Sequence, residues 1–216
     1  MKKALSIVVC LAIVVFALTG CGGPSVVPDS NNGGENGIVD NRNEGTVTNQ
    51  EEQNTQKENV TVTDEDFSIV GYPYEDSFSS MYFLVVTNNS KSTVEFSANG
   101  IARDANGGMI GADDLSIDVL GPGETSIGYF YFSDVKDVAS VDYTFEYDTS
   151  SYYYPVISNL SIEQTSNDRN VTVKVTNNGN SCAEFVEAHA LFFDSSNNVI
   201  SHTSNYVVDN DSEIKP

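Results

Sequence analysis

The chain has 216 residues, of which 31 are acidic and 10 are basic, so its formal charge at pH 7 is −21. This acidic composition argues against binding to nucleic acid, because phosphates are bound by clustered Lys and Arg. It argues equally against attachment to a membrane through a polybasic patch. Three Cys residues are too few for a disulfide scaffold, since only two of them could ever pair.

The chain begins with the features of a secretory signal peptide. Lys2 and Lys3 precede a run from Ala4 to Leu18 in which one Ser is the only polar residue. The run is shorter than the ~20 apolar residues that a membrane-spanning helix needs, and a positive start followed by a short apolar run is typical of a secreted precursor. We expect residues 1–20 to be removed. The alternatives are a signal peptide with an incidental Cys and an uncleaved anchor.

The next residues, Leu18-Thr19-Gly20-Cys21, resemble the lipobox of bacterial lipoproteins: an aliphatic residue, two small or modest ones and Cys. By this resemblance the chain is cut before Cys21, and the Cys21 thiol carries a diacylglyceryl group. Two acyl chains give stable attachment, whereas a single chain gives marginal attachment. We therefore expect a protein anchored to a bacterial membrane through Cys21 and facing the extracytoplasmic side.

Residues 22–60 contain no aromatic residue and are rich in Asn, Gly, Glu, Gln and Thr. So few apolar groups cannot offset the entropy lost on ordering, which predicts an acidic, disordered tether over 21–60, including the lipidated Cys21.

From Phe67 onward, apolar and polar residues alternate with a period of two, most clearly over 141–148 and 171–176. This pattern predicts β-strands. Asn106-Gly107 is typical of a hairpin turn, because both residues accept a positive φ. No stretch longer than a turn or two has a helical period, so we expect an all-β fold.

The folded part contains an internal repeat. The matching segments are Val-Thr-Asn-Asn at 86–89 and 175–178, Glu-Phe at 95–96 and 184–185, the hairpin Asp at 104 and 194, and Leu120-Gly121-Pro122 with Ile214-Lys215-Pro216. The interval from Glu to Asp is nine residues in the first copy and ten in the second. We therefore predict a bulge near Val186–Glu187 that returns the apolar residues of the second copy to the inner face.

Residues 61–150 have room for about seven short strands, which favours a β-sandwich of immunoglobulin type. Residues 151–216 are predicted to form a second, incomplete sandwich, because Pro216 aligns with Pro122 and nothing corresponds to the strands expected over 123–148. One interpretation is that the sequence is a truncated product. The other is that a partner donates the missing strands.

Ala190-Leu191-Phe192-Phe193-Asp194 resembles the motif of FxLYD-type domains, with Ala in place of the leading Phe and Phe in place of the Tyr. The first copy departs further, reading Gly100-Ile101-Ala102-Arg103-Asp104. Members of this family are immunoglobulin-like modules of secreted and lipid-anchored bacterial proteins, and the family assigns no catalytic residues. The resemblance implies a fold and a location.

Several groups of polar residues are candidate cation sites. The segment from Asp104 begins like a calcium loop, but Gly108 and Met109 occupy its fifth and sixth positions, where an oxygen ligand and Gly are needed, so we expect a hairpin. The pair Asp113-Asp114 and the triplet Asp209-Asn210-Asp211 are expected to be solvated loops, with a weakly bound surface cation as the alternative.

Glu187 and His189 are two residues apart, and His202 lies across the predicted hairpin, so the three could bind zinc. An exposed polar strand face is the more ordinary interpretation. Cys182 is expected to lie at a strand end, and no nucleophile, phosphate-loop, cofactor or paired-Cys zinc motif is present in the sequence.

Tyrosines gather at Tyr152-Tyr153-Tyr154, with Tyr72 and Tyr74 near the start of the first copy. Exposed tyrosines could contact a glycan or a protein ligand. We favour the interpretation that they pack at the junction between the copies and at the ends of the sandwich.

Together these features predict a non-catalytic bacterial surface lipoprotein that serves as an adhesion, recognition or spacer module. The alternatives are a metal-dependent surface enzyme, which would require Glu187, His189 and His202 to cluster, and an assembly subunit completed by a strand from a partner.

Overall fold

The computed structural model describes residues 61–149, 152–167, 170–207 and 213–216, together with the backbone of residues 9–15. All of these belong to one compact unit, Met1–Cys21 with Val60–Pro216. The remaining signal residues, the lipobox with Cys21 and the predicted tether lie outside the described residues.

The described residues form β-strands and two short 3₁₀-helices, and none of them is in an α-helix. The elements in chain order are β1 (Val9–Val15), η1 (Asp64–Asp66), β2 (Phe67–Glu75), β3 (Ser79–Asn88), β4 (Val94–Arg103), β5 (Met109–Leu120), β6 (Thr125–Ser133), β7 (Ser140–Asp148), η2 (Ile157–Asn159), β8 (Leu160–Ser166), β9 (Val171–Asn177), β10 (Ala183–Glu184), β11 (Val186–Phe193), β12 (Val199–Tyr206) and β13 (Glu213–Ile214). The predicted all-β class is confirmed. Among these elements there is no helix with the length and hydropathy to cross a membrane.

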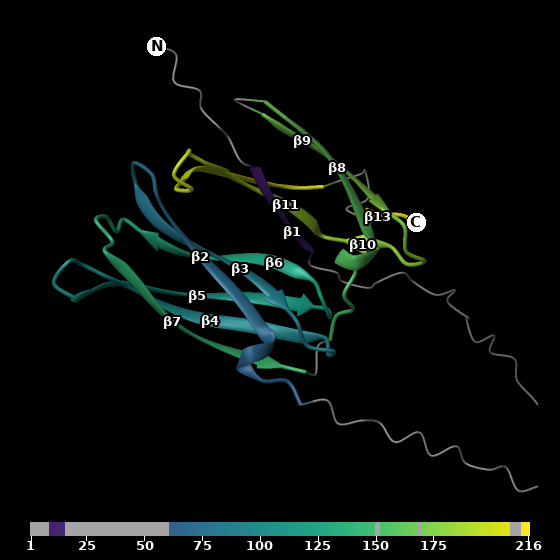
Figure 1. The fold of residues 1–216 in the computed structure, drawn as a ribbon, viewed down its shortest axis with the longest axis horizontal. Helices are drawn as coiled ribbons and strands as arrows, with labels where there is room; N and C mark the ends of the chain where they lie inside the picture. The colour runs from purple at the N-terminus through teal and green to yellow at the C-terminus, as the bar shows by residue number, and fades with distance from the viewer. Residues whose placement is uncertain (1–8, 16–60, 150–151, 168–169, 208–212) are drawn as a thin grey trace, which may run out of the picture. The chain divides into compact units, whose positions relative to one another are not determined.

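The first repeat consists of two antiparallel three-stranded sheets. Strands β2, β3 and β6 form one sheet, and β5, β4 and β7 form the other (Figure 1). Their inner residues form a buried core, because every second side chain of a strand points to the same face. In β4, for example, Phe96 and Ala98 are buried and Ser97 and Asn99 are exposed. The first repeat is therefore a sandwich with a continuous core.

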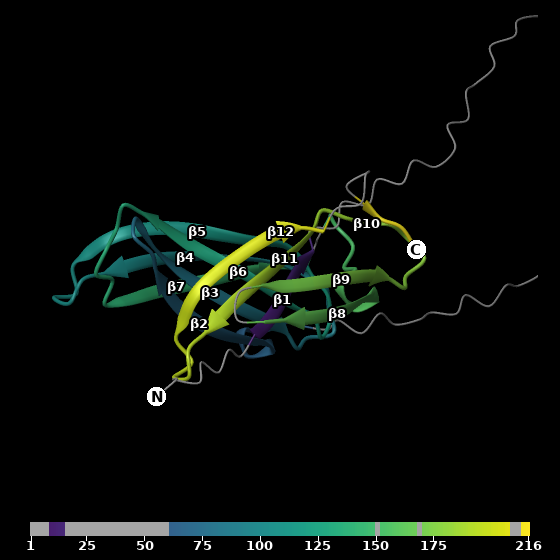
Figure 2. The ribbon, with the colours of Figure 1, turned by 90° about the horizontal axis from the view of Figure 1, so that it is seen from above.

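The described strands of the second repeat form three separate sheets. Strands β8 and β9 pair with each other, β11 pairs with both β12 and β1, and β10 pairs with β13. Figure 2 shows β1, drawn in purple, running beside β11. The apolar segment predicted to belong to the signal peptide thus forms a strand of the second repeat.

A buried Asn holds the same turn in both repeats. In the first repeat, the Asn88 side-chain amide donates to the carbonyl oxygens of Ser92 at 2.8 Å and Leu120 at 2.9 Å, and its oxygen accepts from the Ser90 amide at 2.9 Å. The corresponding bonds of the second repeat join Asn177 to Ser181 at 2.7 Å, to Ile214 at 2.9 Å and to Gly179 at 2.9 Å. The repeat predicted from the sequence is therefore a repeat of structure.

The two Asp-initiated hairpins are also alike. The Asp104 carboxylate accepts from the amides of Asn106 and Gly108, each at 2.8 Å. Asp194 accepts in the same way from Ser196 at 2.8 Å and Asn198 at 2.9 Å. The predicted hairpin at Asp104 is confirmed, and the Asp104 carboxylate accepts its hydrogen bonds from the amides of the turn.

The irregularity predicted near Val186 is present one residue earlier. Phe185, between β10 and β11, has a φ of 53° and is exposed. Ala183 and Val186, on either side of it, are both buried in the core of the second repeat. A single residue in the left-handed region therefore absorbs the extra residue and restores the inner face.

The outer faces of the two repeats pack together. Phe83 of β3 and Ile127 of β6 form one buried cluster with residues of β11 and β12, namely Leu191, Phe193 and Val199. The Tyr72 ring meets the Phe193 ring edge-on at 5.2 Å. Strands β3 and β11 are therefore covered on both faces.

Candidate binding site in the second repeat

The second repeat has a strand edge whose counterpart in the first repeat is covered by β7. Asp104 and Asp194 are equivalent, so Gly100 and Ala190, four residues before them, are equivalent as well. β7 pairs with β4 and places Tyr143 opposite Gly100. β1 pairs with β11, in the same antiparallel sense, and places Leu11 opposite Ala190. Strand β1 thus occupies the position of β7.

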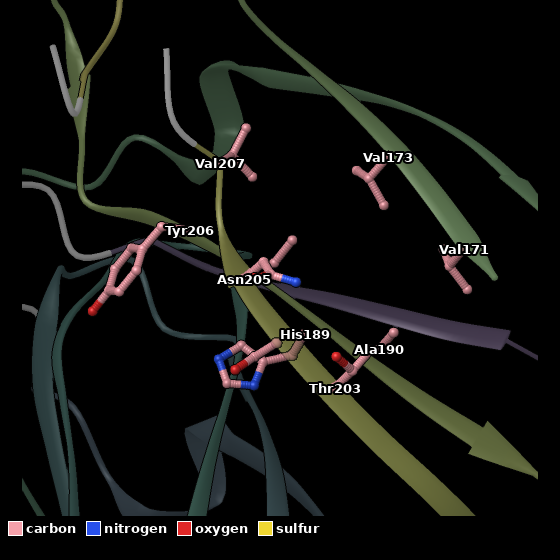
Figure 3. Close-up of a pocket in the computed structure, with 10 residues that line it drawn as sticks. Val171, Val173, His189, Ala190, Thr203, Asn205, Tyr206 and Val207 are labelled. Atoms are coloured by element: carbon pink, nitrogen blue, oxygen red, sulfur yellow. The ribbon is translucent and has the colours of Figure 1, made fainter. Parts of the chain in front are cut away.

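The second repeat also contains a pocket of about 330 Å³ (Figure 3). It lies between β9 and the pair β11 and β12. Its lining is mixed, with apolar Val171, Val173, Ala188, Ala190 and Val207 and with His189, Thr203, Ser204, Asn205 and Tyr206. In the part of the chain that the structure describes, β9 has β8 as its only partner strand, whereas β3 pairs with both β2 and β6. The pocket therefore lies beside the position that a counterpart of β6 would take.

In the first repeat an aromatic ring fills the equivalent place. Phe130 of β6 is fully buried, and a Cβ added to Gly100 would lie 2.7 Å from its ring. The residue equivalent to Gly100 is Ala190, which lines the pocket. The pocket is therefore the space that a side chain like Phe130 would occupy. Apart from His189, sequence reasoning missed these residues, although the equivalence of Gly100 and Ala190 in the repeat was a signal that could have revealed them.

The predicted set of Glu187, His189 and His202 does come together, on the face of β11 and β12 that packs against the first repeat. His189 is buried, and its Nδ1 lies 3.4 Å from Nε2 of His202. Its Nε2 lies 3.3 Å from a carboxylate oxygen of Glu187. The His202 ring is 4.7 Å from the Phe83 ring and 6.0 Å from the Tyr129 ring. The prediction of an exposed polar face is therefore wrong at these three residues, because the first repeat covers this face.

Burial disfavours the charged form of both imidazoles. Desolvation lowers the pKa of His202 to about 4, with a further lowering by His189 and an opposing effect of Glu187. Desolvation also lowers the pKa of His189, against the charge and hydrogen bond of Glu187. Both rings are neutral at pH 7, so each can donate one hydrogen bond and accept another. The distances fit a chain of two hydrogen bonds, in which Nε2 of His202 donates to Nδ1 of His189 and Nε2 of His189 donates to the Glu187 carboxylate.

This arrangement is not a shared metal centre. A metal ion bound by all three residues would need their ligand atoms to converge, but Glu187 and His202 meet opposite nitrogens of the His189 ring. No group of three or more His, Cys, Asp or Glu side chains among the described residues has an arrangement that could hold a metal ion.

The other candidate residues are dispersed. Asp113 accepts a hydrogen bond of 2.7 Å from the Tyr131 amide, and Asp114 is exposed on β5. Asp209, Asn210 and Asp211 lie outside the described residues. Cys182 is half-buried directly before β10, which agrees with the predicted strand end.

The tyrosines divide into two groups. Tyr72 and Tyr74 pack against the cluster between the repeats, as we favoured. Tyr152 and Tyr154 are 83% and 68% exposed, so the expectation that they pack at the junction is wrong for these two. The junction is instead held by Glu124, which accepts from the amides of Gly121 and Ser158, each at 2.8 Å.

Comparison of the chain with protein-family models, with curated proteins and with solved structures gives no match.

Proposed function

We propose that the chain is a non-catalytic lipoprotein of the bacterial cell surface, anchored through Cys21, whose two repeats act as an adhesion, recognition or spacer module. The observation that carries this proposal is the sequence Leu18-Thr19-Gly20-Cys21 directly after a short apolar run with a positive start. The acidic tether would then hold the repeats away from an anionic membrane.

The geometry of the folded part supports a binding role over a catalytic one. The most reactive group of side chains, around His189, has both ring nitrogens of that residue engaged and lies buried between the repeats. Tyr152 and Tyr154, in contrast, offer exposed aromatic surface that suits a protein or glycan ligand.

Metabolic labelling with a fatty-acid probe tests the anchor. The wild-type chain should be labelled and the Cys21→Ala variant should not, because the acyl chains are expected on that thiol. Cys182→Ala is the matched control, and it should be labelled like the wild type. Equal labelling of Cys21→Ala and wild type would overturn the proposal.

A second candidate function is that of an assembly subunit completed by a partner strand. The observation that favours it is the position of β1, which pairs with β11 in the place of β7. If residues 1–20 are removed, this edge of β11 loses its partner. Exposed strand edges readily pair with other chains.

A further inference from the structure

We propose that the second repeat is a strand-acceptor site. A two-stranded hairpin of a separate polypeptide, with alternating apolar residues, adds one strand antiparallel to β11 where Val9–Val15 lies. Its other strand lies beside β9, in the place of β6, and puts a large apolar side chain in the pocket beside Ala190. This inference rests on the proposed removal of residues 1–20 and deepens the second candidate function by naming the edge, the orientation and the side chain that is recognised.

Removal of β1 leaves one edge of β11 unpaired. Seven consecutive residues of β11, Val186 to Phe192, are each paired with a residue of β1. Without β1, the only neighbour of β11 among the described strands of its sheet is β12. The backbone N–H and C=O groups that point away from β12 then need another partner, because burying them unpaired is costly. A peptide strand supplies both kinds of group at the required spacing.

The pocket between β9 and β11 has room for a large side chain. Val171 and Val173 form one wall, and Ala188 and Ala190 contribute to the other. Among the described residues that line it there is no Asp, Glu, Lys or Arg, and its polar members are His189, Thr203, Ser204, Asn205 and Tyr206. A ring like that of Phe130 fills the equivalent space of the first repeat. The pocket therefore favours a large apolar side chain over a charged ligand.

The first repeat also provides a probe for this site. Its segment Thr125–Asp148 contains β6 and β7. The equivalent positions in the second repeat lie beside β9 and beside β11. A synthetic peptide of this sequence should bind to the second repeat once β1 has left the edge. Within the peptide, Phe130 would enter the pocket and Tyr131 would point to the outer face, where it is exposed in the first repeat.

The experiment uses the full 216-residue chain, made by cell-free synthesis without membranes so that no processing occurs. Wild type is compared with a Leu11→Pro/Ile13→Pro variant, because proline lacks the N–H that a paired strand needs. The variant should bind the Thr125–Asp148 peptide at least about tenfold more tightly than wild type, since its β11 edge is open. Hydrogen exchange should show that the peptide restores protection to the β11 amides.

Two matched peptides test which of their side chains the pocket recognises. The peptide with Phe130→Asp should lose at least about tenfold in affinity, whereas the peptide with Tyr131→Asp should bind like the parent. A third variant of the chain, Leu11→Pro/Ile13→Pro with Ala190→Phe, should also bind at least about tenfold more weakly, because the added ring fills the pocket from within.

The proposal is overturned if the proline variant binds no more tightly than wild type, if the two Asp peptides bind equally, or if β11 stays unprotected with the peptide present. Protection of the β4 amides reports that the first repeat is folded in every variant. Loss of protection in β8 and β9 that the peptide does not reverse also counts against the proposal. The lipid anchor has no part in this measurement, so its failure in the labelling experiment is separate.

Discussion

The two repeats use the same hydrogen bonds to turn the chain and yet fill their interiors differently. Asn88 and Asn177 hold equivalent turns, and Asp104 and Asp194 close equivalent hairpins. The first core nevertheless contains several buried aromatic rings, whereas the buried residues of the second are Val156, Ala183 and Val186. Turns depend on nearby residues, but a complete core depends on strands that come from elsewhere in the sequence.

The largest single effect is expected at the buried Asn of the first repeat. Asn88→Ala removes three hydrogen bonds and should cost about 3 kcal/mol of unfolding free energy, because the Leu120 carbonyl would remain buried without this donor. Asn177→Ala should cost about 1 kcal/mol, since its bonds are partly accessible to water. Urea titration of both variants measures the two costs. Equal costs would show that the second turn is as well buried as the first.

Enlarging the equivalent residues Gly100 and Ala190 should have opposite effects. Gly100→Ala brings a Cβ within 2.7 Å of the buried Phe130 ring and should destabilise the protein by about 2 kcal/mol. Ala190→Leu should stabilise it by up to about 1 kcal/mol, because the added carbons enter the pocket. Thermal unfolding of the two variants is the measurement. Destabilisation by both would mean that the second repeat is packed as tightly as the first.

The smallest effect should come from the protonation of histidine and should arise in the second repeat, which has both histidines of the chain. The pKa of His202 falls from 6.5 to about 4 on folding. As the pH drops below 6.5, the unfolded chain takes up a proton that the folded chain does not, so stability falls between pH 6.5 and 4. Because His202 is partly exposed, we expect a loss of about 1 kcal/mol, less than the full shift implies.

Urea titrations of wild type and His202→Gln across this pH range measure the contribution of His202. The Glu187 and His189 side chains and the Tyr129 ring face this imidazole in both proteins. The difference in stability between the two proteins should therefore change with pH by the amount that His202 contributes. A difference that stays constant from pH 7 to pH 4 would contradict the assignment.

Local features of the fold could be predicted from the sequence. The hairpin at Asp104, the irregularity at Phe185 and the hydrogen bonds of each buried Asn to the turn that follows it depend on residues close to one another in the chain. The Glu-to-Asp interval is one residue longer in the second copy than in the first. This difference places the irregularity within one residue, because strand parity must be restored for the apolar side chains to stay inside.

Contacts between distant residues could not be predicted in the same way. Alternation assigns one apolar face to a strand, but Met81–Val86 and Ala190–Phe193 are nearly continuous apolar runs, which is typical of strands covered on both faces. Those runs were the available signal that the repeats pack together, which buries His189 and half-buries His202. The pairing of β1 with β11 had no local signal, because an apolar run fits a signal peptide and a strand equally well.

The pairing of β1 with β11 also has a consequence in time. Val9–Val15 leaves the ribosome before every other described strand, and Val186–Phe193 follows about 170 residues later. At ordinary elongation rates the first segment waits roughly ten to thirty seconds before its partner strand exists. Strands β2 to β10 are all synthesised during that interval. The pairing of β1 with β11 is therefore a late step, which follows the synthesis of the whole first repeat.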